Sequence, residues 1–288
     1  MASNSTDGVH NFVLYNYNPS KAAAFLFLIL FGIATIAHVF LMVRHRTWYF
    51  VPFVIGLIFE AVGYVGRALS AGETPNWTTG PYILQSLTLL LGPTLLAASI
   101  YMTLGRLVRF LQAEQYSPIR TTWLTKIFVT GDVLSFLTQG GGGGIIAQAK
   151  TADKVSLGEN VILGGLILQI LFFGVFMAVT VVVHRRIAGF ATRRPTFFYV
   201  LYGVSVMIMV RSIFRVAEYA GGSDGALQKS EVYIYVFDAT LMLVVAILFG
   251  VYHPSKVMDP RSVERNKSTP LYGSSSYPLR DRTESMAA

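Results

Sequence analysis

Seven apolar stretches, each close to the length of a membrane-spanning helix, restrict the fold of this chain more than any other feature. They comprise residues 22–43, 48–70, 82–105, 124–146, 161–183, 197–219 and 232–252. A helix needs about 20 predominantly apolar residues to cross the hydrocarbon core of a bilayer. The third stretch ends in a basic segment, and the fourth is the least apolar. The pattern predicts an all-α membrane protein with seven transmembrane helices.

Composition supports the membrane class and excludes several kinds of site. Hydrophobic residues make up 53% of the 288 residues and charged residues only 13%, whereas a soluble domain carries about 25% charge. The chain has no cysteine, which excludes disulfides, thiolate metal sites, cysteine nucleophiles and palmitoylation. The sequence contains no nucleotide-binding, hydrolase or metal-ligand motif. We therefore expect no metal, no cofactor and no enzymatic activity.

The distribution of Lys and Arg predicts how the helices are oriented. Cytosolic loops of membrane proteins carry an excess of these residues. One side of the predicted helices has 15 of them, and the other side has only Lys21, Lys150, Lys154 and Lys229. The net charge of +8 therefore indicates membrane orientation, and we expect no nucleic-acid partner. The predicted domains are an extracellular N-terminal segment (1–21), a transmembrane domain (22–252) and a disordered cytosolic tail (253–288).

The first residues support an extracellular N-terminus that is kept in the mature protein. They lack the basic region and the short apolar core of a cleaved signal peptide. Glycosylation sequons at Asn4 and Asn76 fall on the predicted outer side, and a third at Asn266 falls on the cytosolic side.

Seven ionisable residues lie well inside the apolar stretches. They are Glu60, Arg67, Asp132, Arg211, Arg215, Glu218 and Asp238. Each charge at the centre of a bilayer costs about 2.5–3.5 kcal/mol when it is unpaired. The seven together would cost close to 20 kcal/mol, more than the net stability of a typical domain. They must therefore be paired with one another, hydrated, or both.

Spacing places several of these charges on shared helix faces. Gly56, Glu60, Gly63 and Arg67 follow one another at intervals of four, three and four residues, and Arg211, Arg215 and Glu218 form a second such row. Small residues beside a charge let a neighbouring helix approach closely. We expect a polar cluster around a hydrated cavity in the outer half of the membrane. The alternative is that buried ion pairs serve only to fix the register of the helices.

Uncharged polar residues and a run of glycines also stand out within the spans. Gln85, Gln139 and Gln169 are expected to hydrogen-bond between helices. Five glycines, residues 140–144, end the fourth stretch. Because glycine weakens a helix, this run predicts either a break that contacts lipid or ligand, or a frayed helix end.

Six segments of the chain resemble the fungal lipid-translocating exporter proteins. They are "FEAVGYVGR" (59–67), "LLGPTLLAASIYMTLGR" (90–106), "FVTGDVLSFLTQGGGG" (128–143), "RSIFRVAEYAGG" (211–222), "GALQKSEVYIYVFDATLM" (225–242) and "HPSK" (253–256). The serine in "HPSK" departs from the glycine more often expected there. The resemblance covers nearly all of residues 22–256 and excludes both ends. The seven ionisable residues inside the apolar stretches, together with Gln139 and Glu231, match the polar pattern of this family.

The resemblance implies a multi-pass protein of the fungal plasma membrane or endomembranes. Such a protein would move amphipathic lipids, such as sphingoid bases or phospholipids, or regulate their movement, with stress and drug resistance as the outward effect. The predicted partners are thus membrane lipids and an amphipathic lipid substrate. The predicted ligand-binding residues are Glu60, Arg67, Asp132, Gln139, Arg211, Arg215, Glu218 and Asp238. The acids would contact a cationic head group, and the arginines would balance them or hold a phosphate.

Two other classes of function fit seven helices with an outer N-terminus. The first is a seven-transmembrane receptor or lipid sensor, although the third and seventh stretches lack the usual receptor motifs and no outer disulfide can form. A retinal protein is disfavoured because the seventh stretch has no lysine for a Schiff base. The second class is a structural or chaperone-like membrane partner whose charged faces assemble with other proteins.

Overall fold

The computed structural model describes residues 17–111, 114–149, 151–187, 195–221 and 225–257. Long helices dominate these residues, and no strand occurs among them. The long helices are α1 (Lys21–His45), α2 (Val51–Gly72), α3 (Thr79–Phe110), α4 (Thr121–Ala147), α5 (Ala152–Ile187) and α6 (Pro195–Ala220). A seventh rod combines α7 (Glu231–Ile234), a π-helical turn (Tyr235–Thr240) and α8 (Leu241–Val251). Short elements are α9 (Pro254–Val257) and the 3₁₀ turns η1 (Trp48–Phe50), η2 (Glu114–Tyr116) and η3 (Ala226–Lys229).

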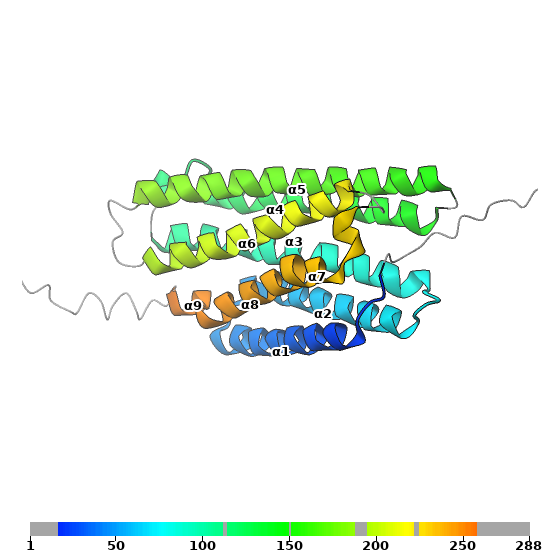
Figure 1. Cartoon of the computed structure of the whole chain (residues 1–288). Helices are drawn as coiled ribbons and strands as arrows, with labels where there is room; N and C mark the ends of the chain where they lie inside the picture. The colour runs from blue at the N-terminus through cyan, green and yellow to red at the C-terminus, as the bar shows by residue number, and fades with distance from the viewer. Residues whose placement is uncertain (1–16, 112–113, 150, 188–194, 222–224, 258–288) are drawn as a thin grey trace, which may run out of the picture.

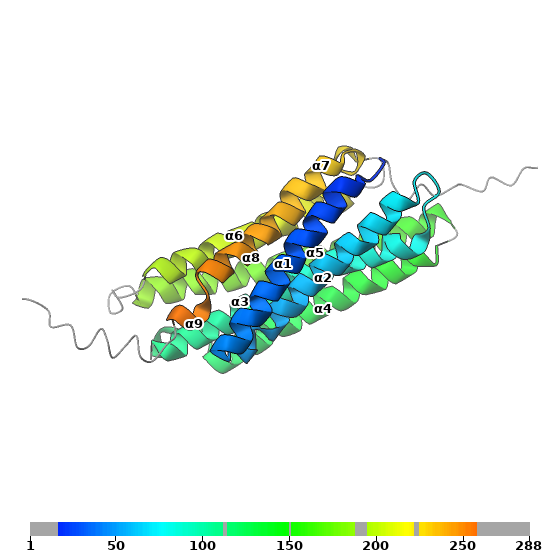
Figure 2. The same cartoon turned by 90° about the horizontal axis from the view of Figure 1, so that it is seen from below.

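The rods form an elongated bundle in which consecutive rods run in opposite directions (Figure 1). Each packs on the next along the chain, and α8 also packs against α6 and α1. Figure 2 shows α1 running along the bundle between α2 and α8. The start of α1 and the short α9 lie at opposite ends of the bundle (Figure 1). The predicted disordered tail starts at residue 253, but His253 is buried and Pro254–Val257 form α9. The rest of that tail, beyond residue 257, and residues 1–16 of the predicted N-terminal segment lie outside the described residues.

Six helical segments of the described chain are long and apolar enough to cross a membrane. They are Lys21–His45, Trp48–Gly72, Thr79–Phe110, Ala152–Ile187, Phe197–Ala220 and Glu231–Val251. The 27-residue α4 is not among them, because glycines and polar residues dilute its apolar character. The outer surface of α1 is apolar. Its exposed side chains, each more than half accessible, include Phe25, Ile29, Ile33 and Ile36. Such a continuous apolar surface is stable only when lipid or protein covers it.

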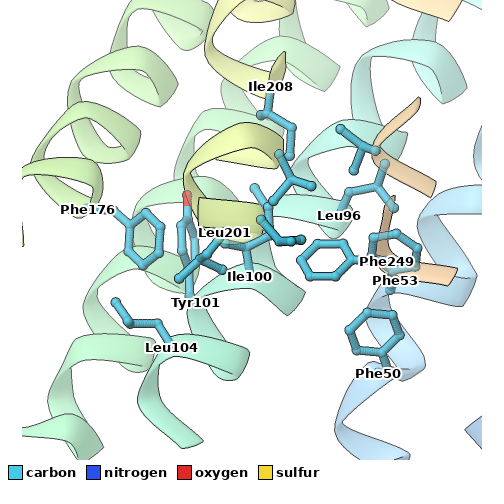
Figure 3. Packing of buried hydrophobic residues seen from close by; sticks show 14 of the residues in the cluster. Phe50, Phe53, Leu96, Ile100, Tyr101, Leu104, Phe176, Leu201, Ile208 and Phe249 are labelled. Carbon is cyan, nitrogen blue, oxygen red and sulfur yellow. The ribbon is translucent and has the colours of Figure 1, made fainter. Parts of the chain in front are cut away.

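Aromatic and aliphatic side chains fill one part of the bundle interior (Figure 3). The rings of Phe50 and Phe53 lie 4.6 Å apart, and each meets Phe249 of α8 edge-on. Tyr101 of α3 lies 4.5 Å from Phe176 of α5, measured between ring centroids. Contacts of this kind connect α2, α3, α5 and α8 and fix the rotation of each helix about its axis. That rotation determines which polar side chains point inward.

The row of small residues on α2 brings this helix close to α3, as its spacing predicts. A Cβ atom added to Gly56 would lie 2.8 Å from the carbonyl oxygen of Gly92. One added to Gly63 would lie 2.5 Å from the Leu89 side chain. Without those glycines the two backbones would have to separate.

The glycine run does not break α4, so the predicted break or frayed end is wrong. The helix continues to Ala147, and two of its glycines face α5 or α3 closely. A Cβ atom on Gly142 would lie 2.7 Å from the carbonyl oxygen of Gly158, and one on Gly143 would lie 2.9 Å from Leu87. Close helix packing therefore compensates for the low helix propensity of the run.

Alanine substitutions at two adjacent glycines of this run are expected to change the stability of the protein differently. Gly142→Ala should destabilise the folded protein by about 1–3 kcal/mol, because overpacking forces α4 and α5 apart. Gly141→Ala is the matched control, since nothing lies within 4 Å of its added Cβ. This control should be neutral or up to about 1 kcal/mol more stable through helix propensity. Thermal unfolding of both variants in detergent measures the difference. Equal stability of the two would contradict the close contact.

Candidate functional site

All eight residues predicted to bind ligand are buried in the structure. The bundle separates them into groups instead of gathering them around one point. Arg211, Arg215, Glu218 and Asp238 form one network, which we call the arginine–carboxylate cluster. Glu60 lies beside this cluster, Arg67 has other partners, and Asp132 and Gln139 lie on α4.

The arginine–carboxylate cluster joins α6 to the seventh rod. Arg211 Nε donates to Asp238 Oδ1 at 2.8 Å, and Arg215 Nη1 donates to Glu218 Oε2 at 2.9 Å. Arg215 also pairs with the second oxygen of Asp238, so one carboxylate holds both arginines. Arg211 donates in addition to the carbonyl of Leu89 on α3. Because a buried guanidinium needs several acceptors, these bonds account for the tolerance of two arginines in an apolar helix.

A π-helical turn presents Asp238 to the two arginines. Residues Tyr235–Thr240 form this turn inside the seventh rod, and the Thr240 hydroxyl donates to the carbonyl of Tyr235 at 2.8 Å. A π turn inserts one extra residue and re-aims the side chains that follow, and such turns are frequent at functional sites. Nothing in the apolar pattern of residues 232–252 indicates it.

Glu60 lies next to the arginine–carboxylate cluster without joining its ion pairs. Its side chain is fully buried, and neither carboxyl oxygen has a hydrogen-bond partner among the described residues. Glu60 interacts electrostatically with Asp238, Arg211 and Arg215. On the α3 side it contacts Gly92, where an added Cβ would lie 2.8 Å from Glu60 Oε1. Gly92 therefore provides the space that this carboxyl group occupies.

Arg67 is bonded to residues that precede α1 and to residues at the start of the seventh rod. Its Nη2 donates to Glu231 Oε1 at 2.8 Å and to the Tyr17 hydroxyl at 2.9 Å, and its Nε donates to the Tyr235 hydroxyl at 2.9 Å. The backbone N–H of Ser20 donates to both Glu231 oxygens, at 2.9 and 3.0 Å. Burial raises the pKa of Tyr17, so its phenol stays protonated at neutral pH.

The predicted ligand-binding set contains Arg67 but none of its side-chain partners Tyr17, Tyr235 and Glu231. Glu231 belongs to the polar pattern of the resembling family and begins the last rod. Its place in that pattern could have identified Glu231 as a site residue. Tyr17 precedes the first apolar stretch, and the packing of α1 on α2 brings it to Arg67.

Asp132 and Gln139 do not contact the arginine–carboxylate cluster within the described residues. Gln139 Nε2 donates to Gln169 Oε1 of α5 at 3.1 Å, which confirms a hydrogen bond between helices. Asp132 lies beside the Tyr101 hydroxyl of α3 and interacts with it electrostatically. The expected convergence of Arg211, Arg215, Glu218 and Asp238 is thus found, whereas Asp132 lies apart from it. Asp132 and Gln139 lie on α4, which packs on α3 and α5 instead of on α8.

Comparison with known proteins identifies the family. The family described as "RTA1 like protein" matches residues 53–261, which is most of the chain. The chain belongs to the RTA1-like family. This assignment confirms the resemblance to fungal lipid-translocating exporters. The match includes all eight predicted site residues and Glu231, whereas α1 and Tyr17 precede it.

Several curated fungal proteins are similar to this RTA1-like chain over most of its length. "Protoporphyrin uptake protein 1" of Saccharomyces cerevisiae is 37% identical, over 83% of this chain and 91% of its own. "Probable lipid transporter atnI" of Emericella nidulans is 28% identical, over 85% of this chain and 68% of its own. "Sphingoid long-chain base transporter RSB1" of S. cerevisiae is 23% identical, over 82% of this chain and 72% of its own. No solved structure matches the chain.

The apolar helices and these relatives together indicate a multi-pass membrane protein. The relatives carry the names of transporters and not of enzymes. RTA1-like membership therefore supports lipid transport in a broad sense.

Proposed function

We propose that this RTA1-like protein translocates amphipathic lipids, sphingoid bases or phospholipids, across the fungal plasma membrane and thereby contributes to stress and drug resistance. The observation that carries the proposal is the arginine–carboxylate cluster buried inside a bundle whose outer surface is apolar. Two relatives named as a lipid transporter and a sphingoid long-chain base transporter support the same class of cargo. Their names also favour transport over the receptor and structural alternatives.

The proposed topology has seven transmembrane helices, an outer N-terminus and a cytosolic C-terminus. The seven rods alternate in direction, which fits α4 crossing the membrane together with the six more apolar segments. In this orientation Arg67 and Glu231 lie near the outer surface. The arginine–carboxylate cluster and Glu60 lie deeper.

A lipid head group would bind at the arginine–carboxylate cluster while its tail stays in the bilayer. The arginines offer donors to a phosphate, and the acids offer acceptors to an amine. Because Asp238 and Glu218 already hold arginines, Glu60 is the acid available to a cationic head group. The chain has no nucleotide-binding motif, so directional transport needs an ion gradient or another protein.

Protoporphyrin uptake is a second candidate, and a specific observation favours it. The relative named for this activity is 37% identical to the chain, compared with 28% and 23% for the two lipid transporters. Protoporphyrin is also amphipathic, but it carries carboxylates and would bind through arginines instead of acids. The charge of the preferred cargo therefore separates the two candidates.

Reconstitution of the full-length protein in liposomes tests the proposed function. We expect the protein to accelerate leaflet exchange of fluorescent sphingosine or fluorescent phosphatidylethanolamine relative to protein-free liposomes. Arg215→Lys should slow this exchange about tenfold, because an ammonium cannot bridge two carboxylates as a guanidinium does. Arg109→Lys is the matched control, since the Arg109 side chain is half exposed. Acceleration of protoporphyrin alone would favour the second candidate, and acceleration of no probe would reject both.

A further inference from the structure

Glu60 differs from the two other acids beside it in having no cation of its own. Glu218 and Asp238 each accept hydrogen bonds from arginine at 2.8–2.9 Å. Neither oxygen of Glu60 accepts one from any described residue, although its side chain is fully buried. A carboxylate in this position would lack both solvent and a bonded counter-ion, which is a costly arrangement.

The acids of the site outnumber its arginines by one, so one more positive charge would make the site neutral. Two arginines, Arg211 and Arg215, face three acids, Glu60, Glu218 and Asp238. The site is neutral when one acid carries a proton. Glu218 and Asp238 are held as anions by direct ion pairs, so the proton belongs on Glu60. Gly92 packs close against Glu60 on the α3 side, and a proton fits there without moving α3.

The groups around Glu60 include N–H donors that make no hydrogen bond within the described residues. Arg211 and Arg215 of α6 and Asp238 of the π turn interact with it electrostatically, Tyr64 lies on its own helix, and α3 presents Gly92. Arg211 Nη1 and Arg215 Nε have no hydrogen-bond partner among the described residues. An ionised Glu60 would attract these donors and compete with Asp238 for the arginines. The same side chains thus support two arrangements that differ by one proton.

We infer that Glu60 is a proton-binding site that couples cargo movement to a transmembrane proton gradient. This inference rests on the proposed function. When Glu60 releases its proton to water, the O–H bond breaks and the electron pair stays on the carboxylate. The site then carries one net negative charge, which a cationic head group neutralises. Reprotonation expels that head group, so one proton is exchanged for one cationic lipid.

Proteoliposomes that contain a pH-sensitive dye test the coupling with fluorescent sphingosine as the probe. A gradient of one pH unit corresponds to about 1.4 kcal/mol per proton and should accumulate the probe about tenfold. We expect dye and probe signals to move together in the wild-type protein. Glu60→Gln should neither move protons nor accumulate sphingosine, because an amide can bind neither the proton nor the cationic head group. Proton movement that persists in Glu60→Gln, or that is lost in Asp132→Asn but not in Glu60→Gln, would overturn the inference.

Infrared difference spectroscopy provides a readout that needs no cargo. Titration of the full-length protein should reveal the carbonyl band of a protonated buried carboxyl that is missing from Glu60→Gln. Glu73→Gln is the matched control, because Glu73 is a water-facing acid just after the same helix. A wild-type protein without this band would reject the proton site. If the band is present but no lipid probe moves in liposomes, the proton site stands and the proposed function fails.

Discussion

Replacing Asp238 with Asn is expected to destabilise the folded protein by about 3–5 kcal/mol, which is the largest effect we expect from a single substitution. Asp238 is fully buried and holds Arg211 and Arg215 together. An amide in its place leaves two guanidinium groups in an apolar interior, with Glu218 as the carboxylate that stays ion-paired to one of them. Equilibrium unfolding in mixed detergent micelles measures the change. A loss of transport in this variant would therefore reflect lost folding as much as a lost contact with cargo.

Glu60→Gln is the control for Asp238→Asn and should change the stability by less than about 1 kcal/mol. Glu60 makes no ion pair that the substitution would break, and an amide closely resembles a protonated carboxyl group. In Asp238→Asn, however, Glu60 can ionise and balance the released arginines. The double variant should therefore be less stable than the sum of the two single changes predicts. If the changes in unfolding free energy are strictly additive, Glu60 and the arginines are not energetically coupled.

Separating Arg67 from Glu231 is expected to have the second largest effect, and the effect should depend on which residue is removed. Glu231→Met leaves the fully buried Arg67 guanidinium with only hydroxyl partners and should cost about 3–5 kcal/mol. Arg67→Met should cost less, about 1–3 kcal/mol, since Glu231 is 17% exposed and keeps the Ser20 N–H. The same unfolding measurement gives both values.

The double variant Arg67→Met with Glu231→Met tests whether this pair serves only to fix helix register. Replacing a buried ion pair with apolar side chains is often neutral or stabilising. We expect the double variant to recover most of the stability that either single variant loses. If it also transports fluorescent sphingosine at the wild-type rate, the pair has a structural role only. If it remains as unstable as Glu231→Met, the pairing energy assigned to these residues is wrong.

The helical class and the identity of the buried charges were predictable from local patterns. Seven apolar stretches predict seven rods, and the structure has a rod at each of them. Spacing of three and four residues placed Gly56, Glu60 and Gly63 on one face, which packs against α3. The same rule placed Arg211, Arg215 and Glu218 in one row, and two of them share an ion pair. Helical periodicity is a local property, so it can be determined from sequence.

The partners of those charges were less predictable. Arg67 was expected to join the other arginines, but Glu231 and Tyr17 bind it. The π turn that carries Asp238 has no signature in the apolar pattern. The glycine run of residues 140–144 suggested a break, whereas α5 packs on it and keeps it helical. In each case a contact between distant segments overrode the local preference.

The sequence by itself determined that this protein is helical, suited to a membrane and obliged to neutralise charges in its interior. The length of each apolar stretch and the energetic cost of a buried charge impose these properties on any arrangement of the helices. Only the tertiary structure decided that Asp238 holds two arginines, that Arg67 meets Glu231 and that Glu60 is left without a cation. Those pairings depend on the rotation and depth of each helix, which are set by side-chain packing among all the helices together.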